Sequence, residues 1–398
     1  MIGSAGVSPW AATARSLYLV AMGVFLVTIA IGILNGLDAV EFDRNQVLTH
    51  VHSGTVGWLT LAIVATTFLV YRATDTRLAI ALGITVPVYV LAFYTGSYPF
   101  RAIAGVALLV VILWLLVWTW RTYLGGERSL PRLGLALALT TFTYGAIVGV
   151  LLQVGFAANA AIVPGDGIGA HAGAMTFGYL VLAGMAIAEW RVLGTAGIPR
   201  GGLVQMAALF IGGLILSLAL LTGAAQVGGM LYLLAELVAV ILFLVRVVPV
   251  AVRGIGSVAD GRGHLALASL WIVIAMALFM YLVSQFIANP DPNAINPGLL
   301  IGSDHSVYIG VITNSVFAVL AMLLAARTLA PLVQAIVQWG MNAGLLVFVI
   351  GLVSDTQVLK QIGAPTMGVC LLIGLALYGF GLLGARTDPA PEALAAAA

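Results

Sequence analysis

Residues 50–71 read HVHSGTVGWLTLAIVATTFLVY, and this stretch decides the fold. It opens with two histidines and continues without a charged residue for about the 20 residues that an α-helix needs to cross a bilayer. The rest of the chain is similar in character, because 62% of its 398 residues are hydrophobic and only 8% are charged. A soluble domain carries about a quarter charged residues. The sequence therefore predicts an all-α, polytopic membrane protein whose main partner is the lipid bilayer.

Twelve such stretches follow one another along the chain, separated by short connections. The two longest connections, 38–49 and 289–303, carry turn-forming residues and are expected to be exposed loops that could cap a site. No separate soluble domain is visible, so residues 1–398 are expected to form one transmembrane domain. The predicted spans are 14–36, 50–71, 77–96, 100–120, 131–157, 168–190, 201–223, 228–249, 264–287, 304–326, 329–353 and 361–384.

Positive charges sort to one side of this topology. If the N-terminus is cytoplasmic, thirteen of the sixteen Lys and Arg residues fall on the cytoplasmic side, and only Arg44, Arg101 and Lys360 fall outside. The positive-inside rule therefore predicts that both termini are cytoplasmic, in a bacterial-type inner membrane. A net charge of +2 gives no argument for a nucleic-acid partner, and the single cysteine, Cys370, excludes an intramolecular disulfide.

Four of the five histidines fall near the outer face. His50 and His52 begin the second predicted span, His171 begins the sixth and His305 begins the tenth. The fifth, His264, begins the ninth span at the inner face and is expected to be an ordinary interfacial histidine. Any one of the other four could simply bond to water or backbone. However, neutral imidazole is the commonest metal ligand, and ionisable residues within membranes are usually functional, so four at one depth predict a cofactor or metal site.

The histidine-bearing spans resemble one another in sequence. Residues 50–62 and 171–183 are identical at six of thirteen positions, and the tenth span repeats the five-residue spacing from His52 to Gly57. Glycines at this depth could leave room for a flat ligand or could serve ordinary helix packing. The similarity predicts three repeats of four helices, covering 14–120, 131–249 and 264–384.

Twelve helices in three four-helix units, with histidines on the second, sixth and tenth, resemble subunit I of the heme–copper oxidase superfamily. That family holds a low-spin heme between histidines of its second and tenth helices near the outer face. HVHSGTVG at 50–57 is also similar to the His-x-His-x-x-x-x-Gly of NnrS-type proteins, which are twelve-helix heme and copper proteins linked to nitric oxide response. HSVYIG at 305–310 is similar to a second phrase of that group. The resemblance covers the whole topology but only these short phrases in sequence.

The chain departs from catalytic oxidase subunits at the copper site. Its seventh span contains no histidine, and Ser303 stands where the family has the first histidine of a His-x-His. The usual oxygen-reducing centre is therefore not expected, and the resemblance leaves open whether the chain is an oxidoreductase. It implies one heme b with His52 and His305 as axial ligands. His50 and His171 could then hold a second metal, with copper as the candidate, or a heme propionate.

Three other polar residues are candidates for function. Glu236 is the only carboxylate expected at mid-membrane depth, where it could relay protons, bind a cation, or remain a neutral acid bonded between helices. Asp304 could cap the tenth span or hold the imidazole of a neighbouring histidine. Tyr179 aligns with Trp58 in the repeat comparison.

The leading hypothesis is a membrane b-heme protein that transfers electrons, from a donor or partner subunit not named by the sequence, or that handles nitric oxide or oxygen. The alternative is a secondary transporter in which Glu236 is the protonatable group. Transporters often contain internal repeats, but these are commonly inverted. Units of four helices are parallel, and the histidines gather near one face, so the pattern favours the heme protein.

Overall fold

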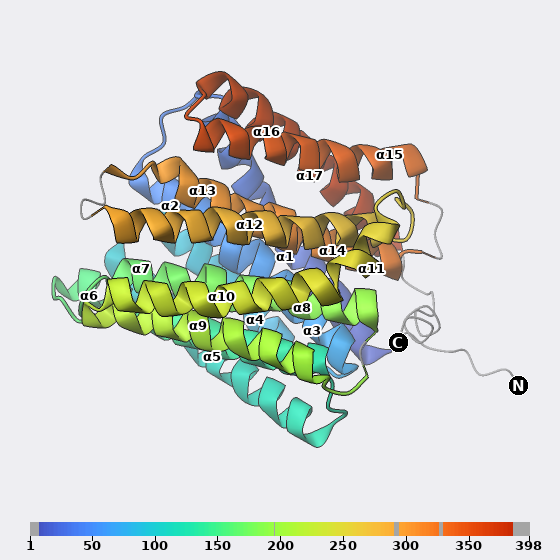
Figure 1. Cartoon of the computed structure of the whole chain (residues 1–398), viewed down its shortest axis with the longest axis horizontal. Coiled ribbons are helices and arrows are strands. Elements are labelled where there is room, and N and C mark those ends of the chain that lie inside the picture. The colour runs from blue at the N-terminus through green and yellow to red at the C-terminus, as the bar shows by residue number, and fades with distance from the viewer. Residues whose placement is uncertain (1–7, 195, 290–293, 326–328, 385–398) are drawn as a thin grey trace, which may run out of the picture.

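The structure is a computed structural model that describes residues 8–194, 196–289, 294–325 and 329–384. Within these residues, twelve helices are long and apolar enough to cross a membrane, as the sequence predicts. They lie side by side in one bundle along the long axis of the molecule (Figure 1). The all-α, polytopic fold is confirmed. The Pro-Asp-Pro part of the 289–303 connection and the residues Arg327 and Arg386 used in the charge comparison lie outside the described residues.

Several spans are built from consecutive helical segments rather than from one uniform helix. The twelve spans, in chain order, are α1 (Pro9–Gly36); α2 (Arg44–His52), η1 (Ser53–Thr60) and α3 (Leu61–Tyr71); α4 (Thr76–Tyr94); α5 (Tyr98–Gly125); α6 (Leu130–Ala158); α7 (Gly167–Gly173), η2 (Ala174–Leu180), α8 (Val181–Ala188) and η3 (Glu189–Leu193); α9 (Arg200–Thr222); α10 (Ala225–Arg246), α11 (Val248–Ala251) and η4 (Val252–Gly254); α12 (Arg262–Ala288); α13 (Pro297–His305), η6 (Ser306–Thr313) and α14 (Asn314–Leu323); α15 (Pro331–Ala335), η7 (Ile336–Gly340) and α16 (Met341–Val353); and α17 (Gln357–Gly384).

The second and tenth spans begin earlier than predicted. Helix α2 begins at Arg44 because the carboxylate of Asp43 accepts a hydrogen bond from the backbone N–H of Gln46 in a capping box. Part of the expected 38–49 loop is therefore helical.

Helix α13 likewise begins before the expected start of its span. The side chain of Asn296 accepts a hydrogen bond from the Gly298 N–H and caps the helix, which starts at Pro297. The prediction that Asp304 caps the tenth span is therefore wrong. His305 follows the first residue of its helix by eight positions, about 12 Å at 1.5 Å per residue. His305 therefore lies well inside the tenth span and not at its first residue.

A wide helical turn recurs at one register in the second, sixth and tenth spans. The π-helical segments η1, η2 and η6 begin at Ser53, Ala174 and Ser306, which are equivalent positions in the repeat alignment. The π-helix accounts for well under 1% of residues in proteins and is frequent at functional sites. Its recurrence at matching positions supports the division into three four-helix units.

The glycines that follow the histidines serve helix packing. A Cβ at Gly57 would collide with Val24, and one at Gly310 would collide with the ring of Trp271. Neighbouring helices therefore already occupy the space beside these glycines. This agrees with close packing through small residues, not with room for a flat ligand.

Candidate cofactor site

Four histidines lie toward one end of the bundle, which we call the histidine face. In Figure 1 this is the left end, where the labels α2, α7 and α13 stand. The four side chains come from these three helices, and each is only partly buried: His50, His52, His171 and His305. All four histidines lie on the second, sixth and tenth spans.

Two of these imidazoles are held by the preceding span. The Nδ1 of His50 bonds to the carbonyl oxygen of Thr28 in α1 at 2.9 Å. The Nδ1 of His171 bonds in the same way to the carbonyl oxygen of Gly145 in α6, at 2.8 Å. Each ring is therefore fixed against the helix that comes before it in the chain.

The other two imidazoles are held by their own helix. The Nδ1 of His52 bonds to the Leu48 carbonyl oxygen, and the Nδ1 of His305 bonds to the Ile301 carbonyl oxygen, each at 2.8 Å. A carbonyl can only accept, so in all four rings Nδ1 carries the proton and the neutral imidazole keeps its lone pair on Nε2. A backbone carbonyl on the other ring nitrogen is the usual arrangement of a metal-ligating histidine.

The pairing across the bundle differs from the expected one. His50, rather than His52, lies opposite His305, with ring centroids 6.4 Å apart and ring planes inclined by 24°. A metal–imidazole bond is about 2.0 Å long, so two rings on one metal have centres roughly 6 Å apart. The His50–His305 spacing fits two axial ligands of a single metal. His52 instead stacks on Phe93, with a centroid distance of 3.7 Å.

His50 and His305 line the same cavity. It has a volume of about 420 Å³ and lies among the first, second, tenth, eleventh and twelfth spans. Ligand pockets in proteins usually measure about 300–1,000 Å³ and are apolar with a few polar groups. Most of the lining is apolar, and its polar side chains include Asp304, Gln357 and Lys360. The cavity suits a large, mostly apolar ligand with a metal at its centre.

The floor of the cavity is closed by Trp58. Its ring stacks on Phe25 with centroids 4.8 Å apart and planes inclined by 4°. Its indole N–H donates to the hydroxyl of Thr313 at 2.9 Å, which ties the second span to the tenth. The two spans are thus joined below the histidines that they place opposite each other.

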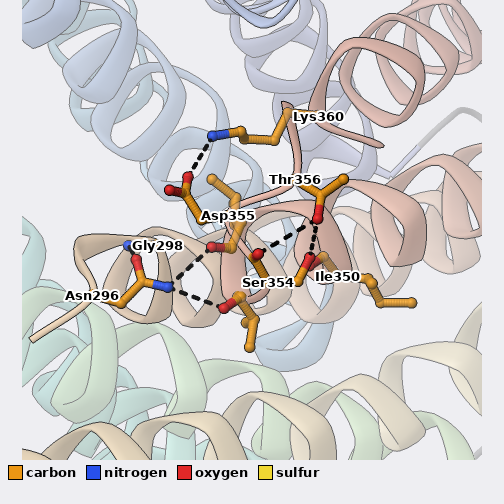
Figure 2. A network of polar contacts seen from close by, with 9 residues as sticks. Asn296, Gly298, Ile350, Ser354, Asp355, Thr356 and Lys360 are labelled. Carbon is orange, nitrogen blue, oxygen red and sulfur yellow. Dashed lines mark hydrogen bonds and ion pairs between the residues drawn. The ribbon is translucent and has the colours of Figure 1, made fainter. Parts of the chain in front are cut away.

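A polar network braces the rim of the cavity (Figure 2). The Asn296 side-chain amide donates to the carbonyl oxygens of Leu352 and Val353, which attaches the start of α13 to the end of α16. Next to it, the Lys360 ammonium pairs with Asp355 at 3.0 Å. The Asp355 side chain is 82% exposed, so this ion pair is weak and the lysine remains available to an anionic group at the cavity mouth.

Asp304 lines the cavity beside His305. It does not hold the Nδ1 atom of any of the four histidines, because each of those atoms bonds to a backbone carbonyl. The expected role of Asp304 as partner of a histidine Nδ1 is therefore not seen. Nearby, the hydroxyls of Thr176 and Tyr308 are 2.8 Å apart and link the sixth span to the tenth.

Glu236 is fully buried on α10, as expected. Neither of its carboxyl oxygens has a hydrogen-bond partner of good geometry in the described structure, and the same holds for the hydroxyl of Tyr232 one turn earlier. The Tyr232 ring packs edge-on against Phe279, which in turn stacks on Phe177. Glu236 does not line the histidine cavity.

Tyr179, which aligns with Trp58, does not line the histidine cavity either. It is buried, and its ring packs against Phe142 at a centroid distance of 4.7 Å. This side chain has a packing role in the second repeat.

The expectation that His264 is interfacial is wrong. The ring is fully buried, and its Nδ1 lies 2.8 Å from the side-chain oxygen of Asn314, which also bonds to Asn342. The start of α12 is covered by the tenth and eleventh spans, because a Cβ at Gly261 would collide with Ala318 and one at Gly263 would collide with Gln338. His264 belongs to a polar network away from the histidine face.

Sequence reasoning missed one buried ion pair. Glu189 is fully buried and receives two hydrogen bonds from the Arg246 guanidinium, at 2.6 and 3.2 Å, and Arg246 also donates to Gln205. A carboxylate within the last predicted residues of the sixth span was the available signal. Glu189 lies near the end of the sixth span, so it does not bear on the expectation that Glu236 is the only carboxylate at mid-membrane depth.

No protein-family model and no curated protein matches this chain. In the described part of the chain, no group of three or more His, Cys, Asp or Glu side chains is placed to hold a metal ion. His50 and His305 come together as a pair.

Proposed function

We propose that this chain is an integral membrane b-heme protein in which His50 and His305 are the axial ligands. The observation that carries the proposal is the position of these two rings across one cavity, each with Nδ1 donating to a carbonyl and Nε2 left as the ligand atom. A tetrapyrrole supplies four equatorial nitrogens, so two imidazoles complete its coordination. The only cysteine is Cys370, so a thioether-linked heme is excluded and the heme is held non-covalently.

Electron transfer is the activity that this ligand set favours. Two strong nitrogen ligands leave no open axial position for a gas, whereas an iron that only exchanges an electron needs none. Handling of nitric oxide or oxygen would require one of the two histidines to leave. The protein therefore acts as a one-electron carrier between a donor and an acceptor in or beside the membrane.

The proposed orientation follows from charge. Of the few cations at the histidine face, Lys360 stands at the cavity mouth, where it would meet the heme propionates. The opposite face carries most of the arginines, so the positive-inside rule assigns it to the cytoplasm of a bacterial inner membrane. The histidine face then looks outward, and both termini are cytoplasmic.

The test is the visible spectrum of the purified protein before and after dithionite reduction. We expect a low-spin b-type spectrum that His50→Ala and His305→Ala each abolish or convert to high spin. The control is Ser303→Ala, because Ser303 lies two residues before His305 on the same helix and its hydroxyl donates to the Ala275 carbonyl oxygen. A wild-type protein without heme, or a spectrum unchanged by both histidine substitutions, would refute the proposal.

A transporter remains the second candidate because Glu236 is a buried carboxyl group whose oxygens have no hydrogen-bond partner of good geometry among the described residues. An intramembrane ionisable residue marks ion or proton pathways in many transporters. Proteoliposomes loaded with a pH-sensitive dye decide between the two. Proton flux that Glu236→Gln abolishes, in a protein that carries no heme, would support transport.

A further inference from the structure

We infer that a second bis-imidazole site for a metal tetrapyrrole lies between the first and second repeats, with His52 and His171 as its axial ligands. The inference rests on the proposed function for the nature of the ligand, but its geometric argument is separate. Two equivalent helix positions carry the histidines, and we call them the first and the second position. In the first repeat they are occupied by His50 and His52.

The side chain at the first position bonds to the preceding span. His50 bonds to Thr28 O and has Gly32 beside its ring, and His171 bonds to Gly145 O and has Gly149 beside its ring. In both cases the glycine follows the carbonyl residue by four positions. His171 is therefore oriented against the fifth span as His50 is oriented against the first.

The histidine side chain at the second position bonds to a carbonyl of its own helix. His52 and His305 bond to the carbonyl four residues earlier, and each packs against a phenylalanine of the following span. Phe93 stacks on His52, and Phe348 meets His305 edge-on with centroids 5.1 Å apart. In the first site a residue in the first position, His50, faces one in the second position, His305.

Applied to the neighbouring interface, this rule places His171 opposite His52. The two imidazoles lie within electrostatic range of each other. Among the described residues, neither Nε2 atom has a hydrogen-bond partner. Neither atom is completely buried, in contrast to Nε2 of His264, which is buried and has no partner. Each Nε2 atom therefore keeps some accessible surface, and its lone pair is not used by the described residues.

A cation accompanies each histidine pair at the same place. Lys360 is the fourth residue of α17 and stands at the mouth of the first cavity. Arg101 is the fourth residue of α5, lies within electrostatic range of His52, and is 1% exposed. Its hydrogen bonds go to Asn45, Ala92 O and Phe93 O, and no described carboxylate pairs with it. A buried guanidinium with no carboxylate in direct contact suits the propionates of a bound ligand.

The third interface lacks all of these features. Ser303 and Gly173 take the two histidine positions there, and the fourth residue of α10 is Gly228. Phe279 replaces the small residue beside the first position and stacks on Phe177 at 3.2 Å. Histidine pair and cation are therefore present together at two interfaces and missing together at the third, which links both features to one ligand.

A tetrapyrrole fits this pair better than a bare ion. No third His, Cys, Asp or Glu of the described chain joins His52 and His171 in a metal-binding group. Zinc and copper(II) sites normally use three or four protein ligands. Four equatorial nitrogens supplied by the ligand itself remove that requirement.

The experiment measures heme per chain by pyridine hemochromogen together with the low-spin spectrum, using the full-length protein in detergent. We expect two hemes in the wild type, and one in each of His171→Ala, His52→Ala and His305→Ala. The double variant His171→Ala/His305→Ala should carry none, and Ser303→Ala should keep both. Added imidazole should restore the second low-spin signal to His171→Ala, which shows that the variant is folded.

The outcomes separate the two proposals. One heme per chain, lost in His305→Ala and unchanged in His171→Ala, overturns the second site and leaves the first. One heme lost in His171→Ala and unchanged in His305→Ala overturns the first site and supports the second. As a further readout, Arg101→Gln should lower the midpoint potential of only one of two hemes, because removing a cation favours the ferric state. Equal shifts of the midpoint potential at both hemes would contradict the assignment of Arg101 to the second site.

Discussion

The indole N–H of Trp58 donates to the hydroxyl of Thr313 at 2.9 Å, both groups being fully buried. Thr313 ends the π-helical segment of the tenth span, and Trp58 lies within that of the second. The Thr313 hydroxyl in turn donates to the Tyr308 carbonyl five residues earlier, a carbonyl that the wide turn exposes. The two spans that place His50 and His305 opposite each other are therefore locked together through their π-helical turns.

Breaking this bond should weaken the protein by a modest, measurable amount. We expect Trp58→Phe and Thr313→Val each to lower the free energy of unfolding by about 1–3 kcal/mol, because each leaves a buried polar group unsatisfied or opens space. The double variant should cost less than the sum. Thermal unfolding in detergent measures all three, and strict additivity would contradict the coupling.

Two glycines should act as matched probes of the two histidine pairs. A Cβ at Gly32 would lie 3.0 Å from Cε1 of His50, and one at Gly149 would lie 2.7 Å from Cε1 of His171. Gly32→Val should displace only the His50 ring and Gly149→Val only the His171 ring. Low-spin heme spectra should then lose a different component in each variant. Gly23→Val is the control, since its Cβ would meet nothing within 4 Å.

The isolated chain should not reduce oxygen. The interface between the second and third repeats carries Ser303 and a stack of Phe177 on Phe279 of the ninth span, in place of metal ligands. With an artificial electron donor, we expect the rate of oxygen uptake to equal that of a heat-denatured control. Sustained, cyanide-sensitive uptake by the chain alone would contradict this and would identify an oxidoreductase.

Reporter fusions test the proposed orientation. A reporter fused after Arg386 should behave as cytoplasmic, and one inserted within residues 38–42 should behave as external, because the positive-inside rule places the histidine face outside. The readout is alkaline phosphatase against green fluorescence for each fusion. The reverse pattern would place the cofactor sites at the cytoplasmic face.

The buried ion pair of Glu189 with Arg246 should matter far more than an exposed one. Removing one partner of a buried pair costs about 3–5 kcal/mol, because the other charge stays buried. We therefore expect Glu189→Gln to lower the unfolding temperature strongly. The matched control is Glu127→Gln, whose partner is Arg132 but whose side chain is 66% exposed, for an expected effect of about 0–1 kcal/mol. Similar effects of the two substitutions would contradict the argument.

The sequence predicted the number of spans, since this follows from length and hydropathy. It also predicted the repeat register, which the π-helical segments at Ser53, Ala174 and Ser306 support. The spans and the repeat register depend on residues that are close together in the sequence, so the sequence pattern predicts them directly.

The choice between His50 and His52 could not be made from the pattern. Side chains that are two positions apart in an α-helix point to nearly opposite faces, because the rotation between them is about 200°. An amphipathic helix would reveal which face meets its neighbours. The second span is apolar and buried on nearly all sides, so its rotation depends on packing with other spans. The burial of His264 was missed for the same reason, because a contact from Asn314 fifty residues away covers it.

The four-helix units have one consequence for symmetry. A unit with an even number of spans starts and ends at the same face, so three such units can be joined in tandem by connections as short as Gly126–Ser129 without turning any of them over. In a ring of three identical subunits, every interface would have to keep or lose its histidines together. A single chain frees each interface to diverge alone, and here Ser303 and Gly173 mark the one that did.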